Sequence, residues 1–151
     1  MQPKTDAVKT ADPEQLIVPM LAYADASAAI SFLCEAFGFK ERFRMAMDDG
    51  RIGHAELTYG DNVVMLASAW REAGFASPME LSGIHTQLYC SVDDVDGHYR
   101  RAFAAGATII SEPSNQAYGR VYRAVDLEGH RWIFGSPVPG SNGKTKDRVP
   151  D

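Results

Sequence analysis

Two side chains that can exchange protons, His54 and Glu56, stand in one short alternating segment of the sequence. The segment, from Ile52 to Tyr59, alternates polar and apolar residues, as a strand with one buried face does. Residues two apart on a strand share a face, so His54 and Glu56 point the same way. The pair could work as acid and base or as metal ligands, or it could make a polar face that holds water or a ligand. Because a catalytic metal site usually has three protein ligands, two such residues favour the polar face.

No other chemistry is suggested by residue spacing. Cys34 and Cys90 lie in apolar segments without metal-type spacing, which indicates two reduced, buried thiols. Ser31 and Ser68 have no histidine at a suggestive spacing, and no glycine-rich phosphate loop is present.

The composition narrows the class of protein. A chain of 151 residues with 45% hydrophobic residues is long enough for one domain with a real core. Its formal net charge of -5, with scattered lysines and arginines, argues against nucleic-acid binding. We find neither a secretory signal nor an apolar run of the roughly 20 residues that a membrane helix needs. We therefore expect a cytoplasmic protein that interacts with neither nucleic acid nor membrane.

Capping and turn signals divide the chain into elements that position these residues. The first half reads as strand, helix and three strands, at 16–23, 26–37, 39–47, 52–59 and 63–67. The second half reads in the same order, at 84–92, 95–105, 108–111, 121–125 and 130–134. Asp25 or Ser27 caps the first helix, Asp93 or Asp94 caps the second, and Gly38 ends the first.

This repeated order predicts an α+β fold made of two paired βαβββ modules. The modules span 15–67 and 83–135, and a connector at 68–82 joins them. A flexible arm at 1–14 and a flexible tail at 136–151 flank them. Each module alone would leave one sheet face bare, so we expect a curved mixed sheet around a cleft, with the helices on the outer face. Trp70 and Phe75 on the connector either close over a ligand or dimer partner, or pin the connector to the core.

Three segments, FLCEAFGFKERF, HAELTYGDNVVMLA and DLEGHRWIFG, resemble the glyoxalase, bleomycin-resistance and extradiol-dioxygenase superfamily, also called the vicinal oxygen chelate fold. The resemblance is strongest to its uncharacterised glyoxalase-like branch and covers about Leu16 to Gly135. It implies a cleft for a small molecule and a homodimer with the clefts at or near the subunit interface. The fold alone does not imply one chemistry, because it hosts many activities.

Metal enzymes of this superfamily take their ligands from the first and last strands of each module. Counting from the helix caps carries these positions to Val18, Met65, Gln87 and Ile133. Among these only Gln87 has an oxygen donor, and a methionine thioether suits soft ions instead. The resemblance therefore implies that the usual metal site is absent and that no cofactor is needed. A divalent metal would need a displaced site at His54 and Glu56.

The seven residues that we expect to line the cleft combine the polar strand with the former metal positions: His54, Glu56, Met65, Gln87, Tyr122, Arg131 and Ile133. Tyr122 enters this set as the counterpart of His54 in the second module. Trp132 and Phe134 should point to the helix side as core.

Three further histidines suggest structural roles. His130 follows an acidic turn and is expected to lock it through a backbone hydrogen bond. His85 and His98 are expected at the surface or at a boundary.

The function that these observations favour is metal-independent binding of a small organic molecule. The acidic charge would suit a cationic, aromatic ligand. The alternative is a lyase, isomerase or dioxygenase that uses His54 and Glu56 with a displaced metal or with none. A third class is a protein whose dimer surface serves an interaction. Whether the chain is an enzyme stays open at this point.

Overall fold

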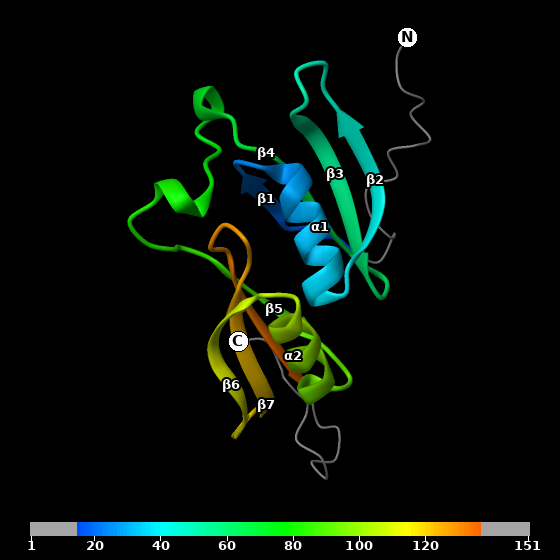
Figure 1. The fold of residues 1–151 in the computed structure, drawn as a ribbon, viewed down its shortest axis with the longest axis vertical. Coiled ribbons are helices and arrows are strands. Elements are labelled where there is room, and N and C mark those ends of the chain that lie inside the picture. The colour runs from blue at the N-terminus through cyan, green and yellow to red at the C-terminus, as the bar shows by residue number, and fades with distance from the viewer. Residues whose placement is uncertain (1–14, 137–151) are drawn as a thin grey trace.

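The computed structural model describes residues 15–136 and contains two four-stranded mixed sheets, each with one helix (Figure 1). The predicted arm and nearly all of the predicted tail lie outside the described residues. The first sheet has the order β1-β4-β3-β2 and the second the order β5-β8-β7-β6. The α+β fold and the repeated βαβββ order are confirmed.

The elements have the following bounds. The first module consists of β1 (Met20–Tyr23), α1 (Ala26–Phe37), β2 (Lys40–Ala46), β3 (Ile52–Tyr59) and β4 (Asn62–Ser68). The connector holds two short 3₁₀ helices, η2 (Arg71–Ala73) and η3 (Pro78–Glu80). The second module consists of β5 (Gln87–Ser91), α2 (Val95–Ala104), β6 (Thr108–Gln116), β7 (Gly119–Val125) and β8 (Arg131–Ser136).

Both helices begin and end at residues suited to caps. The carboxylate of Asp25 accepts a hydrogen bond from the Ala28 amide, and that of Asp94 accepts one from the Gly97 amide. Gly38 ends α1 with a φ of 81°, a left-handed conformation that glycine adopts without steric cost. Of the predicted alternatives, Asp25 and Asp94 are the N-caps.

The edge strands differ from prediction. Leu16 and Ile17, expected in a buried strand, are 90% and 88% exposed, because β1 begins only after Pro19. Proline has no backbone N–H to donate, although its carbonyl still accepts a bond from Met65 at 2.9 Å. β6 instead runs on through Pro113, which was expected in a loop. A register shift against β7 accommodates this proline at the edge of the sheet.

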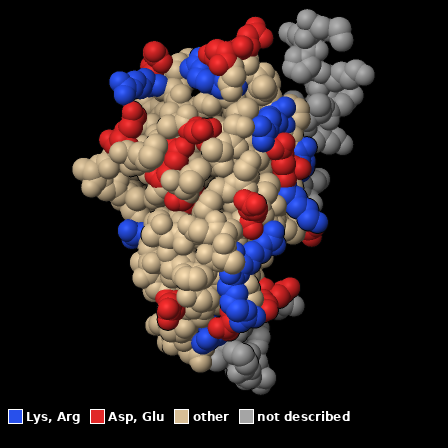
Figure 2. Space-filling view, in the orientation of Figure 1, with Lys and Arg blue, Asp and Glu red and all other residues tan. Residues whose placement is uncertain are grey.

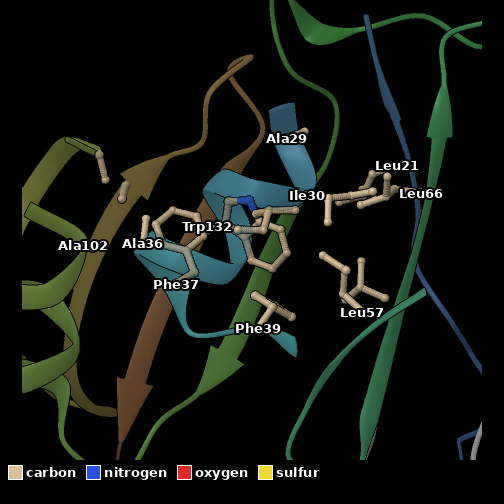
Figure 3. Close-up of a cluster of buried hydrophobic side chains, with 14 of the residues drawn as sticks. Leu21, Ala29, Ile30, Ala36, Phe37, Phe39, Leu57, Leu66, Ala102 and Trp132 are labelled. Carbon is tan, nitrogen blue, oxygen red and sulfur yellow. The ribbon is translucent and has the colours of Figure 1, made fainter. Parts of the chain in front are cut away.

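One hydrophobic core joins the two modules (Figure 3). Phe37 at the end of α1 and Phe39 after it both pack on Trp132 of β8, with ring centroids 5.8 and 5.4 Å apart. Trp132 and Phe134 lie on the helix side, as predicted. Because aromatic rings from both modules share this core, the modules form one packed unit.

The two helices also contact each other, and side chains of α2 complete the end of α1. Arg101 donates to the carbonyls of Glu35 at 3.0 Å and Cys34 at 3.1 Å. His98 bonds the carbonyl of Phe37 at 2.8 Å. These donors satisfy carbonyls that a helix end leaves without an intrahelical partner.

The surface carries charges of both signs. Acidic and basic side chains are interspersed over the face that bears the helices (Figure 2). Some of them form ion pairs, such as Arg44 with Glu41 and Arg120 with Asp96. Among residues 15–136, neither helix has the length and apolar character that crossing a membrane requires.

Candidate ligand site

The face of the first sheet turned away from the helices, which we call its open face, carries a charged cluster around Glu56. Glu56 lies on β3 between Ala55 and Leu57, which both point into the core, so its side chain points to the opposite face. Its side chain is nevertheless fully buried. Arg42 donates to Glu56 Oε1 from Nε at 3.0 Å and from Nη2 at 2.6 Å, and His54 Nε2 lies 2.9 Å from Oε2.

This cluster gives Glu56 and His54 different roles. Glu56 is held in an ion pair, which fits the rule that a buried carboxylate needs charged hydrogen-bond donors. Its two carboxylate oxygens hold the Arg42 guanidinium and the His54 imidazole in place. The bond uses Nε2 of His54, so Nδ1 is the nitrogen that could exchange a proton with a ligand.

The open face of the second sheet is less polar than the sequence suggested. Gln87 and Tyr89 of β5 are exposed, and Ile133 of β8, which pairs with Tyr89, is half-buried. The hydroxyl of Tyr89 lies over Gly135, where any side chain would collide with it. Tyr89 therefore covers part of this face, a role that sequence reasoning missed.

Tyr122 does not line an open face, contrary to expectation. Met65 pairs with Glu56 and Ile133 pairs with Arg123, so Tyr122 corresponds to Ala55 and not to His54. The β7–β8 turn is longer than the β3–β4 turn, and a shift of one residue reverses the face of every side chain on the strand. Tyr122 is fully buried on the helix side.

The partner of Tyr122 is His98, which was expected at the surface or a boundary. His98 Nδ1 lies 2.6 Å from the Tyr122 hydroxyl, while Nε2 bonds the Phe37 carbonyl. Burial lowers the pKa of His98 and raises that of Tyr122. A signal for this position existed in the sequence. His98 is three residues after Val95 and four before Ala102, both of which face the core.

The acidic turn between β7 and β8 binds the second module to the first. Asp126 Oδ2 accepts bonds from the Tyr23 hydroxyl at 2.6 Å and from Trp132 Nε1 at 3.1 Å. His130 Nε2 bonds the carbonyl of Ala22 on β1 at 2.8 Å. Its imidazole was expected to lock its own turn, but it reaches across to the other module instead. The backbone amide of His130, not its imidazole, stabilises the turn by donating a hydrogen bond to Asp126 Oδ1 at 3.1 Å.

The residues of the terminal strands do not fit the divalent metal of the family's enzymes. On the open faces, Met20 pairs with Met65, Gln87 with Arg131, and Tyr89 with Ile133. None of these six residues has a carboxylate or an imidazole. The metal site of the family's enzymes would therefore lack such ligands here even if the positions expected from the sequence were displaced to these neighbouring ones. Within residues 15–136, no three or more His, Cys, Asp or Glu side chains are grouped so as to hold a metal ion.

An apolar cavity of about 410 Å³ lies at the connector end of the first sheet. We call it the methionine pocket and define it by Met45, Met47, Gly53, Ala67, Trp70 and Phe75. Its one charged lining residue is Arg51, which pairs with Asp49 at 2.8 Å. Trp70 is 57% exposed at the rim, and two backbone bonds with Phe75 hold the intervening turn closed. His54 and Glu56 do not line this pocket themselves, although His54 follows Gly53 on β3 and pairs with Met45 of β2, and Gly53 and Met45 both do.

A second cavity, of about 320 Å³, lies where β1, the connector and the start of β8 meet. We call it the seam pocket and define it by Met20, Ala22, Phe75, Leu81, Leu88 and Arg131. Of the seven residues predicted to line the cleft, Arg131 alone lines one of the three cavities described for residues 15–136. The others stand on open faces or, like Tyr122, in the core.

Comparison with known proteins places this arrangement in a family. Residues 15–134 match the Glyoxalase/Bleomycin resistance protein/Dioxygenase superfamily. An uncharacterized protein of Mycobacterium bovis is 34% identical over an alignment of 129 residues, which covers 83% of this chain and 85% of that protein.

Two solved structures extend the similarity to the whole fold. TioX from Micromonospora sp. ML1 is 35% identical with a TM-score of 0.66, over 82% of this chain and 99% of TioX. A glyoxalase/bleomycin resistance protein/dioxygenase family enzyme from Burkholderia phytofirmans PsJN is 26% identical with a TM-score of 0.60, over 77% of this chain and 93% of that one. With the paired βαβββ modules and the family match over nearly all described residues, this chain belongs to the glyoxalase/bleomycin resistance protein/dioxygenase superfamily.

Proposed function

We propose that this protein binds a small organic molecule in the methionine pocket without the help of a metal ion. The observation that carries the proposal is the lining of the pocket. Met45, Met47, Trp70 and Phe75 surround a cavity whose one charged residue is already paired. Apolar and aromatic side chains around a preformed hollow are typical of sites for organic ligands.

The lining also indicates the shape of ligand. Methionine side chains are flexible and polarisable, so they adapt to flat aromatic rings. Trp70 at the rim can stack on a ring that enters. We therefore propose a ligand with an aromatic body, and the net charge of -5 favours a cationic one at long range.

The same proposal includes a homodimer. Several large apolar side chains of the described chain are exposed near the open faces and the edge of β1, including Leu16, Ile17, Met20 and Tyr89. A second copy that covered them would remove this apolar surface from water. We expect the protein to elute as a dimer with the mass of two chains in size-exclusion chromatography with light scattering.

Fluorescence of Trp70 provides the test of binding. The chain has two tryptophans, and the other, Trp132, is only 2% exposed. Titration with the neutral dye Nile red and the cationic dye proflavine should change the Trp70 emission, and the change should vanish in Trp70→Phe. Met45→Glu places a negative charge in the apolar pocket and should weaken binding of the neutral dye Nile red at least tenfold. Met79→Glu, at an exposed methionine outside the pocket, is the matched control.

Two results would contradict the proposal. Equal Nile red affinity for Met45→Glu and the unaltered protein would show that the methionine pocket is not the binding site. One tightly held divalent ion per chain, measured by metal analysis of protein from metal-replete medium, would refute metal independence.

A second candidate function is enzymatic, and the geometry of His54 favours it. Glu56 Oε2 lies 2.9 Å from His54 Nε2 and orients the imidazole, as a carboxylate does for a general base. On this hypothesis, His54→Ala abolishes turnover in a small-molecule extract analysed by mass spectrometry and leaves the melting temperature nearly unchanged. Identical product profiles for the variant and the unaltered protein would exclude His54 as the base.

A further inference from the structure

The seam pocket differs from the methionine pocket in chemistry as well as in place. Its walls come from both modules: β1 of the first, Leu88 and Arg131 of the second, and the connector between them. In Figure 1 the green connector passes beside the orange turn between β7 and β8, and both segments contribute lining residues. Most of the wall is apolar, so an apolar group would fill the cavity well.

Arg131 gives this apolar cavity a positive charge. Among the residues that the structure describes, Nε of Arg131 is the one buried side-chain nitrogen or oxygen without a hydrogen-bond partner. A buried donor without an acceptor is costly, and such groups are rare in folded proteins. His85 and His130 also line the cavity, while no Asp or Glu does. The wall of the cavity therefore supplies no carboxylate to accept a hydrogen bond from Arg131 Nε.

A neighbouring cavity does not share the positive charge of the seam pocket. A cavity of about 590 Å³ lies near the other end of β1, where Pro19 and Leu88 belong to its lining. That cavity has the opposite character, because Asp61 and Asp93 line it and no Lys, Arg or His does. In a chain of net charge -5, a cavity lined by an arginine and by no acidic residue is a place where an anion meets attraction rather than repulsion.

We propose that the seam pocket is a second site, which binds an organic monoanion with an apolar body, such as a medium-chain carboxylate. The carboxylate accepts hydrogen bonds from the guanidinium of Arg131, whose planar fork matches two carboxylate oxygens. The apolar body packs against Met20, Leu81 and Leu88. This site goes beyond the proposed function, since it shares only the wall residue Phe75 with the methionine pocket.

Calorimetric titration with three ligands of equal chain length tests the proposal: decanoate, decanol and decyltrimethylammonium. We expect decanoate to bind at least tenfold more tightly than the other two. Arg131→Met keeps the length of the side chain and removes its charge, so it should lower decanoate affinity about ten- to hundredfold. Arg123→Met, on the neighbouring strand and outside the cavity, should bind decanoate as the unaltered protein does.

Thermal unfolding separates this role from a structural one. Because Arg131 Nε has no partner, Arg131→Met without ligand should melt at the same or a higher temperature, and a lower melting temperature would contradict the proposal. Arg131→Gln, which stays polar but uncharged, should lose decanoate affinity in the same way. Equal affinities for decanoate and decanol, or equal losses in the Arg131 and Arg123 variants, would overturn the proposal. So would decanoate binding that Trp70→Phe abolishes and Arg131→Met does not.

Discussion

Glu128 is the residue whose removal should most directly test how the two modules are held together. It lies in the β7–β8 turn and is only 5% exposed. Its Oε1 accepts bonds from the Ala24 amide at 2.6 Å and from the Ser77 hydroxyl at 2.6 Å. Its Oε2 accepts a bond from the Asp25 amide at 2.8 Å. One carboxylate thus links the second module to the β1–α1 junction and to the connector.

The expected cost follows from these three bonds. A hydrogen bond to a charged group contributes about 1.5–3 kcal/mol, and a buried donor left unpaired costs about 1–3 kcal/mol. Ser77 is buried, whereas Ala24 and Asp25 are exposed, so water can replace part of what the two amides lose. We expect Glu128→Ala to lower the free energy of unfolding by about 3–4 kcal/mol. Glu128→Gln keeps an acceptor for Ala24 and Ser77 but turns its amide toward the Asp25 N–H, so about 1.5–2 kcal/mol should be lost.

Chemical denaturation measures the free energy of unfolding of both Glu128 variants, and thermal unfolding measures their melting temperatures. A loss of about 3 kcal/mol corresponds to roughly 10 °C in a domain of this size. Glu80→Ala, which removes an exposed ion pair with Arg71 on the same connector, should change stability by less than about 0.5 kcal/mol. Hydrogen exchange should become faster at the Ala24 and Asp25 amides in Glu128→Ala. If Glu128→Ala costs no more than Glu80→Ala, the carboxylate does not hold the modules together.

Three further predictions concern groups with unusual environments. Burial lowers the pKa of His98 below 6.5, so the unfolded chain binds this proton more readily than the native one. The stability that neutral His98 contributes to the fold is fully present above pH 6.5 and is lost as the pH falls through the lowered native pKa. Denaturant titrations at several pH values should show that His98→Gln makes the free energy of unfolding less dependent on pH in this range. Burial raises the pKa of Cys90 to about 11, so in a Cys34→Ala background its reaction with a disulfide reagent at pH 8 should be on the order of a hundredfold slower than in denaturant. Equal rates would contradict this. Glu56→Ala removes the buried partner of Arg42 and His54 and should cost about 2–3 kcal/mol, whereas His54→Ala should cost about 1 kcal/mol or less by thermal unfolding. Equal costs would show that Glu56 is not the centre of the cluster.

Much of the fold could be predicted because its signals are local. The caps at Asp25 and Asp94, the glycine after α1 and the alternation of β3 depend on neighbours within a few residues. The bounds of β1 and β6 were wrong because a single proline decides them together with the partner strand. Pro19 delays one strand, while Pro113 is accommodated at an edge by a register shift.

The candidate site was only partly predictable. The sequence placed His54 and Glu56 on one face, and the structure brings them within 2.9 Å of each other. It did not indicate Arg42, whose bonds to Glu56 come from the neighbouring strand. The error at Tyr122 has another cause: the turn of its own β7–β8 hairpin is longer than the β3–β4 turn, and one residue of slip reverses the face of every side chain.

What the sequence alone determined was the repeated βαβββ order, the family resemblance and the identity of the residues at the expected metal positions, where Gln87 alone has an oxygen donor. These follow from residue identity and short-range spacing. The tertiary structure decided what the remaining side chains do. It buried Glu56 in an ion pair, turned Tyr122 toward His98, carried His130 across to β1 and left Arg131 unpartnered in an apolar cavity. The first two roles depend on which elements meet inside one module. Those of His130 and Arg131 depend on how the two modules pack, because residues about 100 positions apart along the chain contact each other only then.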